Sequence, residues 1–464
     1  MSSMKNVLIT IYHKQRFLDL FDLAKQLSFT KDVNILIYIN KEVYSKYKSN
    51  LTNNKNITII NDPEILIESQ KKFTKKTNDK AKLATRLLFN FKTLLLKTSL
   101  AQILKQIRYR RYLDKKYTYF LEILSANNID IIFTTGDRHV HEEPAIIKAA
   151  RDFQVKIVLP YITNYAEPKT IFRVRERSMT ESGSLYSYYM RKKFIRYLYN
   201  GASYYPFYII NTIHKFGVLS KNPWIMGNGV SDIICLDSQR NYDRFINHKV
   251  HEKKLKIVGH YSYDNLYKSY CKRDELIKKI HKKYNLDKDK KNIIISLPQF
   301  SEHELMSNEK HINEVIFMIT SLCQTSQNIL ISLHPKQNID KYIFLEKKFK
   351  CKILSERLMY VLPVADIFIA SYSSTVIWSV ICGIKTLVMN FYGFNSSIFD
   401  ELKSIMVIED KNLFVGTVNN LLESKVDFSS DWKQLSKEEV FDNKVIDRYL
   451  EIINDKSELE SLNE

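Results

Sequence analysis

The sequence predicts an α/β protein made of two Rossmann-like, doubly wound domains that face a cleft. Short apolar, β-branched segments alternate with helical segments along the chain, as in parallel sheets covered by helices on both faces. The length of 464 residues suits two domains of ordinary size. Glycine is scarce, with 10 residues, and neither GxxxxGK[ST] nor GxGxxG occurs. P-loop and dehydrogenase functions therefore lack their phosphate-binding fingerprint.

The first half of the chain supplies one set of strands. Helical segments at 16–28 and 144–153 separate some of them. The expected strands are 6–12, 33–40, 57–61, 130–136, 155–161, 231–238 and 254–259. We assign residues 1–255 to an N-terminal, acceptor-binding domain that carries basic helical insertions at about 71–120 and 169–215.

The second half repeats the pattern more regularly. Helices are expected at 275–284, 312–326 and 375–382. The expected strands are 292–298, 328–334, 351–355, 366–373, 385–390 and 405–408. We assign residues 256–435 to a C-terminal, nucleotide-binding domain and residues 436–464 to a helix that packs back on the first domain. Ligands of such domains bind at the carboxyl ends of the strands.

Cysteine usage and hydropathy place the chain among intracellular proteins without a spanning helix. The five cysteines are scattered and form no CxxC pair, which favours reduced thiols over a disulfide framework or a zinc ribbon. The N-terminus reads as a first strand and not as a signal peptide. The longest uncharged stretch, 197–213, is interrupted by Asn200, Gly201 and Pro206, so a membrane-spanning helix is not expected.

The net charge of +20 lies in two segments. Residues 71–120 carry a net charge of +13 and residues 169–215 carry +7. The first segment has apolar residues at helical spacing between its cations, and the second mixes cations with many tyrosines. This combination suits an anionic membrane surface. A solvated helical face is the plainer alternative. Nucleic acid is not expected because no known binding motif accompanies the charge.

The strongest motif pair lies in the second half. His334 and Pro335 follow an expected strand, and Ser373, Ser374 and Thr375 follow another strand and begin a helix. Hydroxyl groups and free amides at a helix start, opposite a histidine, can bind the phosphates of a nucleotide. Taken alone, Ser374 and Thr375 would suit an ordinary helix cap.

This motif pair resembles the nucleotide-binding half of GT-B glycosyltransferases. It is most similar to bacterial surface-polysaccharide (capsule and lipopolysaccharide) enzymes: sialyltransferases and Kdo transferases with an HP motif and a serine cluster, and polyol-phosphate transferases of teichoic-acid synthesis. The resemblance implies a GT-B fold, with donor phosphates bound by His334, Pro335, Ser373, Ser374 and Thr375.

A second resemblance lies at the expected domain joint. The passage KLKIVGHYSYDNLY looks like the VTG-x-x-x-x-D passage of these enzymes and of UDP-GlcNAc 2-epimerases, with Gly259 and Asp264 as the matching residues. The triplet GDR at 136–138 is also similar to those epimerases. The chain lacks their DSGG-x-x-EE pattern, because it has SYSSTVIWSV there, and this departure argues against an epimerase.

Candidate catalytic residues follow the strand at 130–136. A transfer to a hydroxyl needs a group that takes the acceptor proton. We expect Asp137 in this role, with His141 and Glu142 as substitutes. The glutamates at 142 and 143 also suit the start of a helix because of its dipole. The HxHEE sequence offers no recognisable third or fourth ligand, so neither a metal nor another cofactor is expected.

Two further residues complete the expected donor site. Gln299 follows a strand, where a turn role is equally compatible with its position. Glu356 occupies a place where many GT-B enzymes contact the nucleoside, and a plain surface position is the alternative.

The sequence as a whole predicts a metal-independent glycosyltransferase of bacterial surface-glycan synthesis. A CMP-activated ulosonic acid is the first expected donor, and the acceptor is a saccharide or lipid-linked glycan. The alternatives are a CDP-glycerol or CDP-ribitol phosphotransferase, a UDP-sugar transferase, and, from another class, a non-catalytic membrane-associated assembly protein. The expected location is the cytoplasm, at the inner face of the cytoplasmic membrane.

Overall fold

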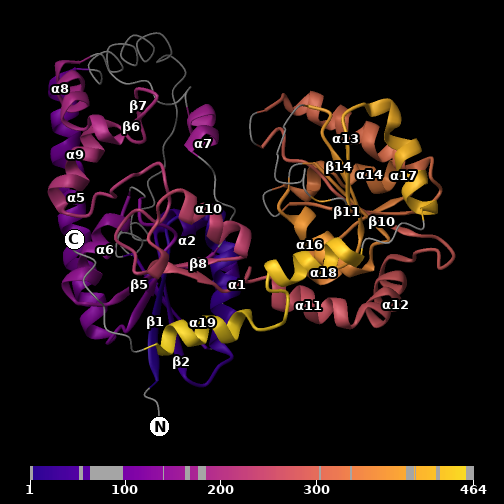
Figure 1. Cartoon of the computed structure of the whole chain (residues 1–464), viewed down its shortest axis with the longest axis horizontal. Helices are drawn as coiled ribbons and strands as arrows, with labels where there is room; N and C mark the ends of the chain where they lie inside the picture. The colour runs from indigo at the N-terminus through magenta and orange to yellow at the C-terminus, as the bar shows by residue number, and fades with distance from the viewer. Residues whose placement is uncertain are drawn as a thin grey trace, which may run out of the picture. The chain divides into compact units, whose positions relative to one another are not determined.

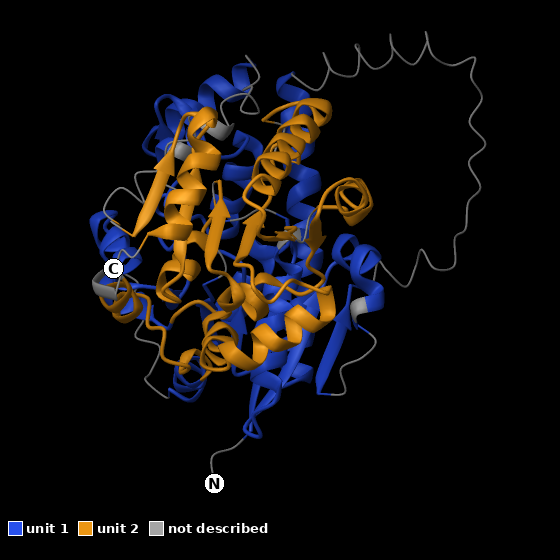
Figure 2. Ribbon diagram, turned by 90° about the vertical axis from the view of Figure 1, so that its right-hand side faces the viewer, with its two compact units in different colours: residues 1–258, 447–464 blue, residues 259–446 orange. Residues whose placement is uncertain are grey.

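A computed structural model gives the fold of the chain as two compact units. One comprises residues 1–258 with 447–464, and the other comprises residues 259–446 (Figure 2). The residues that the structure describes are 4–51, 56–62, 98–138, 141–161, 168–175, 184–302, 305–334, 337–371, 373–392, 402, 404–424 and 429–455. Residues 71–97 of the first basic insertion lie outside these ranges.

Unit 1 contains a parallel sheet with strand order β3-β2-β1-β4-β5-β8-β9. Figure 1 labels β1, β2, β5 and β8 of this sheet. The strands are β1 (Lys5–Ile11), β2 (Val33–Ile39), β3 (Ile57–Asn61), β4 (Ile131–Phe133), β5 (Lys156–Leu159), β8 (Ile233–Leu236) and β9 (Leu255–Ile257). β1 is buried from Val7 to Ile11 without polar alternation, as expected for a strand covered on both faces. The chain first builds β2 and β3 on one side of β1 and then β4 on the other.

Helices connect and cover these strands. They are α1 (Phe17–Ser28), α2 (Lys41–Leu51), α5 (Ser99–Ala126), α6 (Glu143–Asp152), α7 (Pro168–Arg175), α8 (Leu185–Lys193), α9 (Phe207–Phe216), α10 (Gln239–Asn247) and α19 (Val445–Asn454). α6 shows why they form: Pro144 in its first turn needs no amide partner, and Ala145, Ile146 and Ala149 bury one face. A short hairpin of β6 (Leu198–Tyr199) and β7 (Ala202–Ser203), which the sequence analysis missed, precedes α9.

The C-terminal helix α19 belongs largely to unit 1. The hydroxyl of Tyr449 accepts a hydrogen bond from the Tyr161 amide at 3.2 Å, and its ring lies 5.9 Å from that of Phe133. The sequence placed one helix over 436–464. The structure has two, because α18 (Ser429–Glu438) ends in unit 2 before α19 begins.

Unit 2 has a parallel sheet of order β12-β11-β10-β13-β14-β15. Its strands are β10 (Asn292–Ser296), β11 (Asn328–Ser332), β12 (Cys351–Ile353), β13 (Ile367–Ala370), β14 (Lys385–Met389) and β15 (Ile405–Ile408). Its helices are α11 (Tyr263–Cys271), α12 (Arg273–Tyr284), α13 (Asn308–Cys323), α14 (Phe344–Lys348), α15 (Leu358–Val361), α16 (Thr375–Ile381), α17 (Phe414–Glu423) and α18. The boundary of the unit follows Val258, close to the expected start at residue 256.

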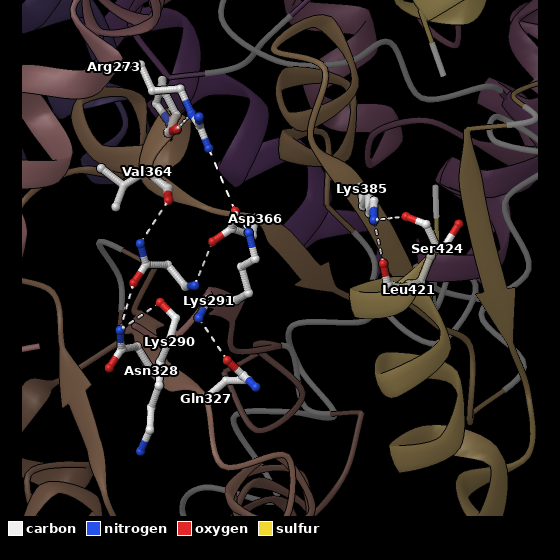
Figure 3. Close-up of polar contacts among 12 residues, drawn as sticks. Arg273, Lys290, Lys291, Gln327, Asn328, Val364, Asp366, Lys385, Leu421 and Ser424 are labelled. Carbon is white, nitrogen blue, oxygen red and sulfur yellow. Dashed lines mark hydrogen bonds and ion pairs between the residues drawn. The ribbon is translucent and has the colours of Figure 1, made fainter. Parts of the chain in front are cut away.

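The amino edge of the unit 2 sheet is held by a polar network (Figure 3). Asn292, at the start of β10, accepts a hydrogen bond from Asn328 on β11 at 3.1 Å and donates to the Val364 carbonyl at 3.3 Å. Its backbone amide donates to Asp366 at 2.8 Å. Lys385, at the start of β14, donates to the carbonyls of Leu421 and Ser424. The buried polar side chains at this edge are therefore paired with one another or with backbone groups.

Candidate functional site

The topology of unit 2 brings three of the expected donor-site residues to one edge of its sheet. β10 lies between β11 and β13, so the connections to either side of it diverge at its carboxyl end. His334 follows β11, Gln299 follows β10 and Ser373 follows β13. In open α/β sheets this divergence is where ligands bind.

The loop that carries His334 is tied to its neighbour. The His334 amide donates to Gln337 Oε1 at 2.8 Å, and the Gln337 amide donates to the His334 carbonyl at 2.8 Å. Gln337 Nε2 then donates to the Pro298 carbonyl at 3.0 Å, which joins the loop after β11 to the loop after β10. Pro335 lies outside the described residues.

A buried network supports these loops from behind. The Tyr342 hydroxyl meets Gln337 Nε2 at 3.2 Å, His311 Nε2 at 2.9 Å and Glu302 Oε1 at 3.4 Å. Burial lowers the pKa of His311, with Glu302 opposing and Lys341 adding to the effect, so the ring is neutral at pH 7. The sequence analysis missed Gln337, His311 and Tyr342, because nothing in their local pattern shows that they meet.

The serine cluster has its own internal hydrogen bonds. The hydroxyls of Ser373 and Thr375 lie 2.7 Å apart, and the Thr375 amide donates to Ser373 Oγ at 3.3 Å. Ser374 is exposed and its side chain makes no capping hydrogen bond to α16. The plain helix-cap alternative for Ser374 therefore does not describe the structure.

Gln299 carries an unpaired polar atom. Its Oε1 is buried without a hydrogen-bond partner among the described residues. A buried acceptor without a partner costs free energy, which a bound water or ligand donor recovers. This observation favours a ligand-contacting role over the turn alternative.

Glu356 is engaged elsewhere. Its carboxylate accepts from Lys283 at 2.5 Å and from the Tyr284 hydroxyl at 2.6 Å, both on α12. Partial burial alone would raise its pKa, but these hydrogen bonds outweigh burial and lower it. The geometry gives Glu356 a place in an ion pair that attaches α12, which does not support its expected contact with a nucleoside.

Gly259 and Asp264 build the joint at the start of unit 2. Gly259 has φ +94°, and a Cβ there would lie 2.8 Å from the Val445 side chain, so only glycine fits without strain. The carboxylate of Asp264 accepts from the amides of Val445 at 3.0 Å and Ile446 at 3.1 Å. Both residues hold the returning C-terminal segment.

The structure corrects the expected role of Asp137 in unit 1. Asp137 is 2% exposed, and its carboxylate accepts three hydrogen bonds, from the amides of Gly227 at 3.2 Å and Gly229 at 2.8 Å and from Ser231 Oγ at 3.0 Å. A Cβ on Gly229 would lie 2.6 Å from this carboxylate. Because its oxygens are committed, Asp137 fixes the 227–231 loop and is not placed to take a proton from a substrate.

Glu142 is likewise part of a buried network. It accepts from the Tyr112 hydroxyl at 2.6 Å and from the Tyr38 hydroxyl at 3.4 Å. Lys116 Nζ lies 3.8 Å from it and 2.5 Å from Asp62. Burial raises the pKa of Glu142, while the Tyr112 hydrogen bond and Lys116 oppose that shift. These contacts do not support a base role for Glu142.

His141 is the expected catalytic residue that reaches solvent. It is exposed and has φ +67°, a conformation that non-glycine residues rarely adopt outside special sites. Its carbonyl accepts from the Tyr109 hydroxyl at 3.2 Å. Its ring meets the ring of His13 edge-on, with centroids 5.7 Å apart.

Over the described ranges, no group of three or more His, Cys, Asp or Glu side chains is arranged to hold a metal ion. Along the same ranges, no helix has the length and apolar character that crossing a membrane requires.

One family matches part of the chain. Residues 239–378 match the family described as CDP-Glycerol:Poly(glycerophosphate) glycerophosphotransferase. This segment runs from α10 to α16 and contains Gly259, Gln299, His334 and the serine cluster. No curated protein matches the chain in sequence.

Solved structures resemble the chain over nearly its whole length. The calicheamicin glycosyltransferase CalG4 has 11% identity and a TM-score of 0.53, covering 97% of this chain and 98% of its own. The UDP-GlcNAc 2-epimerase of Neisseria meningitidis has 10% identity and a TM-score of 0.51, covering 96% and 98%. The epimerase of Methanocaldococcus jannaschii has 13% identity and a TM-score of 0.51, covering 97% and 99%. Together with the two parallel sheets, these likenesses confirm the expected GT-B fold class.

Proposed function

We propose that this protein is a transferase of surface-glycan synthesis that moves a phosphorylated polyol from a CDP-activated donor to an acceptor hydroxyl. The match of residues 239–378 to the glycerophosphotransferase family carries this proposal, because the matched segment contains every expected donor-site residue that the structure describes. It favours the polyol-phosphate alternative over the CMP-ulosonic acid that the motifs first suggested.

The chemistry at the unit 2 edge suits a diphosphate. His334 and the hydroxyls of Ser373 and Thr375 offer hydrogen-bond donors without a carboxylate among them. In the proposed reaction the acceptor oxygen attacks the β-phosphorus of the CDP-polyol. The bond from that phosphorus to the bridging oxygen breaks, CMP leaves with the electron pair, and the acceptor proton passes to a base. Donors fixed around the leaving phosphate stabilise the developing charge.

A ligand-induced thermal shift tests the donor. Purified protein is melted with CMP, CDP-glycerol, CDP-ribitol, a CMP-ulosonic acid, UDP and GDP, without added metal. A ligand that binds only the folded state raises the melting temperature by mass action. We expect CMP and a CDP-polyol to do so, and transfer of radiolabelled glycerol phosphate to a membrane fraction to follow.

Two histidine variants test whether the nucleotide that raises the melting temperature binds at His334. His334→Gln should abolish the CMP shift. His281→Gln changes a buried histidine of the same unit that lies 3.0 Å from Asn292 at the opposite edge of the sheet, and it should keep the shift. Stabilisation by the CMP-ulosonic acid but not by a CDP-polyol would overturn the proposed donor. No shift with any nucleotide would favour the non-catalytic assembly protein.

We further propose that unit 1 contacts an anionic membrane through a basic face formed by α5 and α8. The two helices lie side by side (Figure 1), and Ser99 Oγ accepts from the Tyr186 amide at 3.0 Å. Apolar side chains at helical spacing on α5, and others around α8, are exposed beside cations. The basic face comprises Leu100, Ile103, Leu104, Ile107, Arg108, Arg111, Leu185, Tyr188, Tyr189, Arg191, Lys192, Lys193, Ile195 and Arg196. Such a mixture suits the interface of an anionic bilayer.

Vesicle sedimentation tests this contact. We expect binding to vesicles with phosphatidylglycerol, little binding to pure phosphatidylcholine, and loss of binding at high salt. The triple variant Arg191→Gln, Lys192→Gln, Lys193→Gln should bind more weakly. The control Lys278→Gln, Lys279→Gln, Lys282→Gln removes the same charge from exposed positions of α12. Equal weakening by both triple variants would contradict a specific face.

A further inference from the structure

A cavity lies between helices α5 and α9 of unit 1. The two helices pack against each other (Figure 1), and the cavity has a volume of about 340 Å³, which is within the range of sites that bind small molecules. Its lining residues are inside the two helices and not at the carboxyl end of a sheet, so the cavity is separate from the candidate donor site. They are Gln106, Ile107, Arg110, Arg111, Thr212 and Lys215.

Helical spacing explains how these residues come to share one cavity. The four lining residues of α5 form two pairs, each spaced four positions apart, and the two lining residues of α9 are three positions apart. Residues at such spacings lie on one face of a helix. Thr212 contributes only a short side chain, and its hydroxyl donates to the Tyr208 carbonyl at 2.6 Å on the same helix. This side chain therefore leaves space between the longer side chains around it.

The cavity is positively charged. Three of its lining residues are cations and none is a carboxylate. Arg110 is held in place, because its Nε donates to Asp114 at 2.9 Å and its Nη1 donates to the Lys215 carbonyl at 3.2 Å. Arg111 and Lys215 are exposed and form no ion pair within the described part of the chain. Asp114 thus balances one of the three cations, and a positive charge remains for a ligand.

Gln106 adds hydrogen-bond donors to these charges. Its Oε1 accepts from the Tyr186 hydroxyl at 2.7 Å and from Asn211 Nδ2 at 3.0 Å. Because the oxygen is engaged in this way, the amide offers a ligand its N–H groups. A phosphate group has oxygens that accept hydrogen bonds, and it pairs well with guanidinium and ammonium groups. The polar groups of the cavity therefore match a phosphate.

The cavity also has an apolar wall and borders the basic face. Ile107 is 43% exposed, and the carbon stems of the arginine and lysine side chains are apolar. Ile107 and Arg111 line the cavity and also belong to the basic face of α5 and α8. A ligand with a phosphate joined to an apolar chain fits both parts of this lining, and the bilayer interface is where such molecules are found.

We propose that this cavity binds the headgroup of one anionic phospholipid, with its phosphodiester held by Arg110, Arg111 and Lys215 and the start of its acyl chain against Ile107. A choline or ethanolamine headgroup carries a cation, which the remaining positive charge of the cavity disfavours. A lipid bound at one fixed point sets the orientation of unit 1 on the bilayer, whereas diffuse attraction of charges does not. The inference rests on the proposed membrane contact for the source of the lipid, but binding of a soluble lipid requires the cavity alone.

Isothermal titration calorimetry with a short-chain lipid tests the site without a bilayer. The full-length protein is titrated with dihexanoyl phosphatidylglycerol below its critical micelle concentration. We expect saturable binding of one lipid per chain, and at least about tenfold weaker binding of dihexanoyl phosphatidylcholine and of inorganic phosphate. Equal binding of phosphatidylcholine would overturn the role of the charges. Equal binding of inorganic phosphate would assign the site to free phosphate and overturn the lipid.

Three variants separate the cavity from its surroundings. Arg111→Gln with Lys215→Gln should weaken phosphatidylglycerol binding about tenfold or more and leave the melting temperature unchanged, because neither cation has an ion pair to lose. Ile107→Trp fills the cavity from an exposed position without changing the charge, and it should weaken binding by a similar factor. Arg191→Gln with Lys192→Gln is the control, since it removes two charges from exposed positions of α8 and should leave the affinity for the soluble lipid unchanged.

Vesicle sedimentation of the same variants distinguishes the lipid site from the proposed basic face. Saturable binding of the soluble lipid that depends on Ile107, Arg111 and Lys215 supports the site even if no vesicles are bound, in which case only the basic face fails. Normal binding to phosphatidylglycerol vesicles without saturable binding of the soluble lipid overturns the site and leaves the basic face standing. An equal loss of soluble-lipid affinity in both charge variants would show a general effect of charge and also overturn the site.

Discussion

The two edges of the unit 2 sheet use polar residues in opposite ways. At the amino edge, Asn292, Asn328 and Asp366 bond one another and nearby backbone groups (Figure 3). At the carboxyl edge, Gln299 keeps a buried oxygen without a partner in the described structure. Both edges belong to the same strands, so the difference lies in the residues and not in the fold.

This contrast separates stability from function. A paired buried polar group holds neighbouring elements together, and its loss leaves the partner unsatisfied. An unpaired one adds little to stability and remains available to a ligand. The same division exists at the carboxyl edge of unit 1, where Asp137 is paired with three donors and Glu143 Oε2 is not.

The largest effect is expected at the carboxyl edge of unit 2. His334→Gln should lower the rate of transfer from the CDP-polyol about 100- to 1000-fold, as for the loss of one donor to a developing negative charge. The free energy of unfolding should change by less than about 1 kcal/mol because the His334 loop is held through its backbone. A radiolabel transfer assay and urea unfolding measure the two quantities. If the variant lost as much free energy of unfolding as the fall in transfer rate represents, the carboxyl edge would be as important for stability as the amino edge.

Asn292→Ala, at the amino edge, should have the opposite effect to His334→Gln: it should lower stability and leave nucleotide binding intact. It removes the acceptor of Asn328 Nδ2 and the donor to the Val364 carbonyl, so the free energy of unfolding should fall by about 2–4 kcal/mol. The CMP-induced thermal shift of the remaining folded protein should persist. Loss of that shift at a temperature where the variant is still folded would show that the amino edge also shapes the site.

Asp137→Asn tests the paired residue of unit 1. An amide presents one acceptor where the carboxylate presents two, so some of the donors from the 227–231 loop lose their partner and stability should fall by about 1–3 kcal/mol. The transfer rate per folded molecule should stay within about tenfold of the wild type. A rate loss above about 1000-fold with unchanged unfolding would restore Asp137 as the base.

Glu143→Gln changes the residue of unit 1 whose Oε2 atom is unpaired. We expect this variant to have the smallest effect. Burial raises the pKa of Glu143, its threonine hydrogen bonds oppose this, and the charges of Asp137 and Glu142 add to it. Because the folded-state pKa lies above the ordinary value of 4.5, the folded protein binds more protons than the unfolded chain, and its stability falls as pH rises from there.

The glutamine variant lacks that dependence. Its stability relative to the wild type should therefore increase between about pH 4 and about pH 8. Urea unfolding across this range measures the difference. A stability difference that is the same at every pH would mean that Glu143 has an ordinary pKa in the folded protein.

The sequence predicted the strands and most helices because their signals are local. A strand such as β10 is a short apolar run, and α6 shows helical spacing of apolar residues after a proline. The common position of three predicted site residues could also be inferred. His334, Gln299 and Ser373 each follow a strand, and parallel strands bring their carboxyl ends to one edge.

The pairing of polar groups could not be predicted in this way. Asp137 looked like a cleft base because it follows β4, yet its hydrogen-bond donors come from residues 227–231, some 90 positions later in the chain. Glu143 looked like a residue that complements a helix dipole, and the structure shows an unpaired buried oxygen instead.

The sequence by itself therefore determined the alternation of elements, the fold class and the chemical types at the strand ends, because these depend on neighbours along the chain. Only the tertiary structure decided which of those side chains are already satisfied and which remain available. A hydrogen bond forms between atoms that are close in space, and residues such as Asp137 and Gly229 become close only when β4 and the loop before β8 are packed together.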